Sequence, residues 1–138
     1  MSEVVDKNIE AIGKLIFLTQ KGKVQWSSEE PSVVRGLASD DVISSVFGCR
    51  YNETQLRIYL RRYKGDVPRT LGLLPSWAVE VKHSEMRWYS EIVLEVVDDY
   101  GNSIWQFPKE NILRDLLEAV KYKTSDAHGV IESLLKEQ

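Results

Sequence analysis

The sequence contains few of the residues that form chemical sites. Its 138 residues include one cysteine, Cys49, and two histidines, His83 and His128. A single cysteine forms no internal disulfide, which favours a reducing compartment. Metal centres need several His, Cys or carboxylate ligands at short fixed spacings, and these three residues are scattered along the chain. We therefore expect no metal site, no cofactor, no catalytic residue and no enzymatic activity.

Two pairs of adjacent acids, Asp40-Asp41 and Asp98-Asp99, do not change this expectation. Their oxygens suit Mg²⁺, but neighbouring residues in a strand point to opposite faces of the sheet and rarely chelate together. The second pair also precedes Tyr100-Gly101-Asn102, where turn chemistry accounts for both acids. We interpret both pairs as structural.

Long apolar runs and phosphate-binding loops are also missing. The longest apolar run near the N-terminus is Leu15–Leu18, and Glu3 and Asp6 stand where a signal peptide would be basic. This pattern predicts neither a transmembrane span nor a secretory signal, so we expect a cytoplasmic protein with no membrane partner. The eight glycines are dispersed and form no phosphate-cradling motif.

The composition fits one ordinary globular domain over residues 1–138. Hydrophobic residues make up 43% of the chain and charged residues 28%, and this length is enough to bury a core without disulfides or metals. The net charge is −3, which is too small to imply a strongly charged partner. Nucleic acid is therefore an unfavoured partner.

The clearest folding pattern runs from Tyr89 to Leu117. A β-branched apolar segment around Ile92, a turn containing Gly101 and a second apolar segment ending at Phe107 predict a β-hairpin. Pro108 then ends the strand before an amphipathic helix. We expect His83–Trp88 to be the turn that leads into this hairpin.

Further strands are predicted by alternation of apolar and polar residues. Gln55–Lys64 is the cleanest of these segments, and Trp77–Lys82 alternates in the same way. Val24 and Trp26 begin a strand, and Val42–Tyr51 has mixed periodicity. Ser27–Asp41 has the composition of a loop, and the alternative is a loop that contains one short strand.

Helices are predicted at both ends. An apolar face over residues 3–20, with Gly22 at the C-terminal cap, indicates a helix; the alternative is a hairpin over residues 15–26. Two apolar stripes over residues 109–136 indicate one long helix or two helices broken near Thr124-Ser125-Asp126. Gly129 favours the broken form, since glycine costs about 1 kcal/mol in a helix interior.

These elements predict an α+β fold. We expect an antiparallel β-meander of five or six strands packed against an N-terminal helix and one or two C-terminal helices that cover one face. The middle strand, around Leu94, should be buried on both faces. The predicted core consists of Ile12, Ile16, Leu56, Ile58, Leu60, Val79, Ile92, Leu94, Val96, Ile104, Leu113, Leu116, Leu117 and Val120.

The pattern also resembles a group of known proteins. Leu15-Ile16, Gly22-Lys23, Leu94-Glu95-Val96, Phe107-Pro108 and Leu116-Leu117 look like the corresponding positions of small stand-alone bacterial proteins of uncharacterised function. The resemblance covers most of the chain and is carried by fold-building residues. It implies a helix–meander–helix layout and a bacterial source, and it implies no activity, cofactor or catalytic residue.

One strand face stands out as a candidate binding surface. Arg57, Tyr59, Arg61 and Tyr63, which we call the Arg–Tyr face, alternate with apolar residues on strand 55–64. Basic and aromatic residues on a sheet can hold phosphates and stack bases, and they are also enriched in protein interfaces. Acids on other strands, Glu80, Glu91 and Glu95, offer ordinary cross-strand pairing instead.

The sequence therefore favours a small binding or protein-interaction module. We expect a protein partner or a homodimer that uses part of the Arg–Tyr face, because two-fold pairs are the commonest assembly. The alternative is a nucleic-acid-binding module that uses the basic and aromatic residues of strand 55–64.

Overall fold

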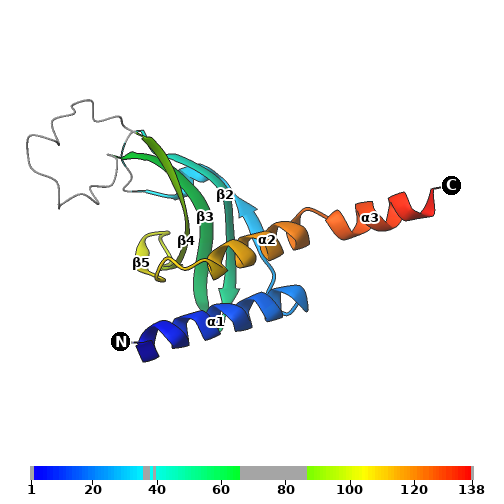
Figure 1. The fold of residues 1–138 in the computed structure, drawn as a ribbon, viewed down its shortest axis with the longest axis horizontal. Helices are drawn as coiled ribbons and strands as arrows, with labels where there is room; N and C mark the ends of the chain where they lie inside the picture. Colours follow the sequence, from blue (N-terminus) through cyan, green and yellow to red (C-terminus); the bar gives the residue numbers. More distant parts are fainter. Residues whose placement is uncertain (1, 36–37, 39, 66–86, 138) are drawn as a thin grey trace, which may run out of the picture.

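A computed structural model describes residues 2–35, 38, 40–65 and 87–137 as a helix, an antiparallel sheet and two further helices (Figure 1). The elements are α1 (Ser2–Gln20), β1 (Ser27–Glu29), the 3-10 helix η1 (Pro31–Val33), β2 (Val42–Tyr51), β3 (Thr54–Gly65), β4 (Arg87–Val97), β5 (Ser103–Gln106), α2 (Ile112–Thr124) and α3 (Ala127–Lys136). The sheet order is β1-β2-β3-β4-β5, and every neighbouring pair is antiparallel. The predicted α+β meander is confirmed.

The main core lies between the sheet and the two helices α1 and α2, which cover one face (Figure 1). Ile58 and Leu94 contribute from the centre of the sheet, Ile12 from α1 and Leu116 from α2, and all four side chains are fully buried. Most of the predicted core residues lie in this cluster or pack against it. Alternation in the strands and a 3.6-residue period in the helices therefore assign this face correctly.

The first helix ends in a hydrogen-bonded cap that excludes the alternative hairpin over residues 15–26. Gly22 has a φ of +75°, and the amides of Gly22 and Lys23 donate to the carbonyls of Thr19 and Leu18. This is the Schellman arrangement, in which a left-handed glycine satisfies the last helical carbonyls. The Trp26 indole then donates to the Thr19 hydroxyl at 3.0 Å, so the chain folds back before β1 begins at Ser27.

Strand β4 is buried on both faces, as the sequence predicts. Leu94 faces the helices and is 0% exposed. Val93 faces the other way and joins Val46 and Tyr59 in a second, smaller core, against which Val33 and other partly buried residues pack. The segment that contains η1 thus covers the second face of the sheet.

Three predictions from the sequence are wrong, and one lies outside the described residues. Val24 and Trp26 do not begin a strand, because β1 starts at Ser27. Ile104 is 63% exposed, because a register shift between Val96 and Val97 leaves it between the residues of β5 that pair with β4. Arg87 and Trp88 belong to β4 instead of a turn. The predicted strand Trp77–Lys82, with the core residue Val79, falls outside the described residues.

The C-terminal segment forms two helices, which resolves the open alternative. Asp126 adopts the left-handed conformation, with a φ of +59°, and separates α2 from α3. Helix α2 packs on the sheet through Leu113, Leu116, Leu117 and Val120. Helix α3 projects beyond the sheet and α1 (Figure 1) and has no buried residue.

We predict that Leu94→Ala lowers the free energy of unfolding by about 2–5 kcal/mol, because it opens a cavity at the centre of the main core. Urea titration measures this change. Ile104→Ala is the matched control, since Ile104 is 63% exposed and should change stability by less than about 0.5 kcal/mol. Equal losses in the two variants would contradict the central position of β4.

Candidate functional site

The candidate site begins with Arg57 on β3, which is 4% exposed and paired with Glu95 of β4, itself 1% exposed. The Arg57 Nε donates to Glu95 Oε2 at 2.8 Å, and Nη2 lies 2.6 Å from the same oxygen. The two residues are direct cross-strand partners. Since a buried charge is tolerated only when it is paired and hydrogen-bonded, each of these side chains requires the other.

The same guanidinium holds two loops against the sheet. Nη1 donates to the carbonyl of Val33, the last residue of η1, at 3.3 Å. Nη2 donates to the carbonyl of Gly101 in the β4–β5 turn at 3.1 Å. Gly101 has a φ of +84°, and the Asp98 carboxylate accepts the amides of Tyr100 and Asn102 within this turn. The predicted turn role of Asp98 is therefore confirmed.

The first half of the Arg–Tyr face is not the exposed surface that the sequence predicts. Tyr59 is 2% exposed and packs with Val46 and Val93. Burial, and secondarily the nearby Glu95 carboxylate, raises the pKa of Tyr59 to about 12. Arg57 and Tyr59 are buried because residues around Val33 lie over this part of the sheet.

The second half of the face is only partly covered. Arg61 donates to the buried Asp41 carboxylate at 2.9 Å and to Glu91 at 3.5 Å. Its guanidinium lies 4.5 Å from the centre of the Tyr63 ring, and Tyr63 stacks on Tyr89 at 5.8 Å. The structure therefore brings Arg61 and Tyr63 together in a network of intramolecular contacts. Glu91 pairs with Arg61 and Glu95 pairs with Arg57, as the alternative of cross-strand pairing predicts.

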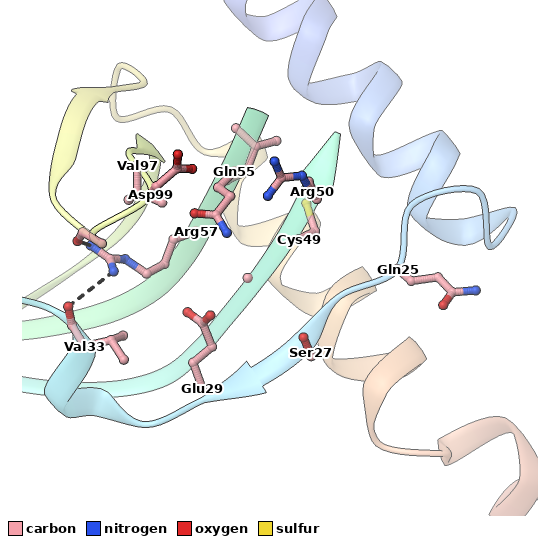
Figure 2. Close-up of a pocket in the computed structure, with 13 residues that line it drawn as sticks. Gln25, Ser27, Glu29, Val33, Cys49, Arg50, Gln55, Arg57, Val97 and Asp99 are labelled. Carbon is pink, nitrogen blue, oxygen red and sulfur yellow. Dashed lines mark hydrogen bonds between the residues drawn. The ribbon is translucent and has the colours of Figure 1, made fainter. Parts of the chain in front are cut away.

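Beside Arg57 lies a pocket of about 440 Å³ (Figure 2). It is lined by side chains of both charges, notably Glu29, Arg50, Arg57 and Asp99. The Glu29 carboxylate lies over Gly48, where a Cβ atom would stand 2.8 Å from Oε2. Sequence periodicity gives no sign of this pocket, because Glu29 and Asp99 come from β1 and a turn far apart in the chain.

Cys49 also lines this pocket but offers no nucleophile. The thiol is buried, and burial raises its pKa from 9.0 to about 12. A thiol in this state carries very little of the reactive thiolate at neutral pH. The predicted structural role of Cys49 agrees with this burial.

A second pocket of about 440 Å³ is mostly apolar and lies between α1 and the β2–β3 turn. Ala11, Leu15 and Leu18 line it from α1, and Tyr51 and Phe107 line it from the other side. We call this the α1 groove. Lys14 is the one charged residue among its lining side chains in the described part of the chain.

An exposed basic and aromatic cluster occupies the far end of the β3–β4 pair. Trp88 is 46% exposed, and its ring lies 5.3 Å from the Arg62 guanidinium and 5.2 Å from the Lys64 ammonium. We call these three residues the Trp88 patch. Arg62 and Lys64 alternate with the Arg–Tyr residues along β3, and Trp88 pairs with Lys64 from β4.

The largest departure from the sequence prediction is the apolar face of α3. Val130, Ile131, Leu134 and Leu135, which we call the α3 stripe, are 53%, 46%, 65% and 75% exposed. Helical periodicity identifies the stripe correctly but cannot show what covers it. Soluble proteins rarely expose several large aliphatic side chains on one face of a helix. Apolar patches of this kind mark interaction sites.

We predict that Arg57→Met and Glu95→Leu each lower the free energy of unfolding by about 3–5 kcal/mol, because each leaves the other charge buried and unpaired. The double variant should be more stable than either single variant, since no buried charge remains. Urea titration of all four proteins completes the thermodynamic cycle.

The control for this cycle is Arg62→Met, because Arg62 lies on the same strand as Arg57 and its side chain is exposed to water. Its loss should be about 1 kcal/mol or less. A double variant whose loss equals the sum of the two single losses would contradict the predicted coupling.

Three negative findings accompany this geometry. Among the described residues, no three His, Cys, Asp or Glu side chains gather closely enough to hold a metal ion. None of the helices in the described ranges combines the length and apolar character needed to cross a membrane. No protein-family model matches the chain, and no curated protein or solved structure matches it significantly.

Proposed function

We propose that this protein is a non-enzymatic protein-interaction module and that α3 is its docking element. The observation that carries this proposal is the exposure of the α3 stripe, whose four side chains are each 46% exposed or more. The same residues recur at helical spacing and form one continuous apolar face. A partner surface that covers this face removes apolar area from water, which is the main favourable term in protein association.

The length of α3 supports the same proposal. It has ten residues, and isolated helices shorter than about 12–15 residues are marginal in water. Most helical stability in proteins comes from packing of an apolar face, yet no residue of α3 is buried. A bound partner would supply the packing that the rest of the described chain does not give.

The cellular setting is part of the proposal. The single cysteine supports a reducing compartment such as the cytoplasm, and the resemblance described above supports a bacterial source. The burial of Arg57 and Tyr59 moves the proposed interaction surface from the Arg–Tyr face to α3.

Site-specific photo-crosslinking in cells tests this function. We expect a benzophenone amino acid at position 134 to give a discrete covalent adduct, because Leu134 would lie in the interface. The matched control places the same group at position 118, since Glu118 is exposed on α2 outside the stripe. Gel mobility and mass spectrometry measure the adducts. No adduct at position 134, or equal adducts at both positions, would contradict the proposal.

The Trp88 patch supports a second candidate function, nucleic-acid binding through the basic and aromatic residues of strand 55–64 and its neighbour. Two cations flank an exposed indole, and such a group can stack on a base while the cations contact phosphates. The net charge of −3 weighs against this alternative.

If the alternative holds, Trp88→Ala should weaken binding of single-stranded oligonucleotides about five- to a hundredfold, because one stacked base contributes about 1–3 kcal/mol. Fluorescence anisotropy over a range of salt concentrations measures the affinity and its salt dependence. Trp105→Ala is the control, because Trp105 is similarly exposed at 47% but packs on Phe107. Equal affinity in the two variants, or no binding at low salt, would exclude this function.

A further inference from the structure

We propose that the pocket beside Arg57 is a binding site for a free basic amino acid such as lysine. The pocket lies on the second face of the sheet, next to the smaller core that the segment around η1 covers (Figure 2). Its volume of about 440 Å³ falls within the range of small-molecule sites in proteins. The pocket contains no residue of α3, so this inference goes beyond the docking function proposed above.

The floor of the pocket is hollow because Gly48 carries no side chain. In the register of the sheet, Gly48 of β2 lies between Ser27 of β1 and Arg57 of β3, and all three residues line the pocket. The Glu29 carboxylate extends over this floor, where a Cβ on residue 48 would stand 2.8 Å from Oε2. A side chain at position 48 would therefore displace Glu29.

Arg57 forms a fixed wall of the pocket, and its charge is already neutralised. Glu95 accepts from Nε and lies 2.6 Å from Nη2, and the carbonyls of Val33 and Gly101 accept from Nη1 and Nη2. A guanidinium carries five N–H donors, and these contacts use four of them. One N–H on Nη1 therefore has no acceptor among the described residues, which favours a polar ligand at this wall.

Three other charged side chains line the pocket without a partner. Glu29, Arg50 and Asp99 form no side-chain ion pair or hydrogen bond within the described part of the chain. Figure 2 shows Glu29 on one side and Asp99 on the other, with the strands that carry Arg50 and Arg57 between them. Charges of opposite sign that share a pocket without pairing leave space for ligand groups between them.

These charges select the class of ligand. Glu95 offsets Arg57, so the unpaired groups are two carboxylates and one guanidinium. A basic amino acid is their complement, because at neutral pH it carries two cationic groups and one carboxylate. Its cations pair with Glu29 and Asp99. Its carboxylate pairs with Arg50, since the planar guanidinium binds carboxylates through two parallel hydrogen bonds.

Isothermal titration calorimetry of the full chain with L-lysine tests the site. We expect saturable binding of one molecule per chain. Cadaverine lacks the carboxylate and Nα-acetyl-L-lysine lacks the α-ammonium, so each should bind about ten- to a hundredfold more weakly, because each loses a hydrogen bond between charged groups.

Three outcomes of this titration would overturn the proposal. Absence of binding up to about 10 mM L-lysine would exclude the site. Equal affinity for cadaverine would identify a diamine as the ligand. Equal affinity for Nα-acetyl-L-lysine would identify the C-terminal residue of a peptide instead of a free amino acid.

A charge variant locates the ligand in the pocket. Arg50→Gln should weaken L-lysine binding about ten- to a hundredfold, because it removes the partner of the carboxylate. Arg62→Gln is the matched control, since Arg62 is exposed on β3 and does not line the pocket. Equal dissociation constants in the two variants would contradict the proposed role of Arg50.

A second variant tests the floor and retains every charge. Gly48→Ala should weaken L-lysine binding about tenfold, because the new Cβ displaces the Glu29 carboxylate. Gly13→Ala makes the same change on α1, where the Cβ meets Ile112 at 3.8 Å, and should leave the affinity unchanged. Circular dichroism checks that both variants fold. A Gly48→Ala protein that is folded and binds L-lysine as tightly as the wild type would overturn the placement of the ligand over Gly48.

Discussion

The buried ion pair between Arg57 and Glu95 is the constraint on which the arrangement of the second sheet face depends. The pair joins the two central strands, and a charge at this depth is tolerated only when its remaining donors are satisfied. Arg57 meets this requirement through the carbonyls of Val33 and Gly101. The segment around η1 and the β4–β5 turn are therefore fixed by the needs of one side chain, and together they close much of a surface that an open antiparallel sheet would expose to water.

This closure determines where an interaction surface can lie. The Arg–Tyr face has the composition of an interface, but Arg57 and Tyr59 are internal and Arg61 is engaged by Asp41 and Glu91. The other sheet face is covered by α1 and α2. Exposed apolar side chains on the described helices concentrate instead on α3, which contributes nothing to either core. The exposed apolar surface of the described helices therefore lies mainly on α3, which contains no buried residue.

The fold was largely predictable because alternation and helical period report which side of an element is apolar. They do not report whether the polar side is open to water. Arginine and tyrosine alternating with Leu56 and Ile58 look the same whether solvent or a second layer lies above them, and only the acid Glu95 on another strand hinted at burial. Ile104 was misassigned because a register shift in β5 depends on pairing geometry that the local pattern does not contain. The α3 stripe was assigned correctly as an apolar face, but periodicity does not show what an apolar face packs against, and α3 does not cover the sheet together with α2.

The break between α2 and α3 explains why that stripe stays away from the core. Asp126 adopts a left-handed conformation that aspartate tolerates better than most residues, and it interrupts the helix between α2 and α3. Its carboxylate then lies against the first turn of α3, where a Cβ on residue 129 would stand 2.7 Å from Oδ1. Gly129 therefore has a structural reason to be present despite the helix propensity that it costs. Asp126 and Gly129 together start a new helix whose apolar face joins neither of the two cores.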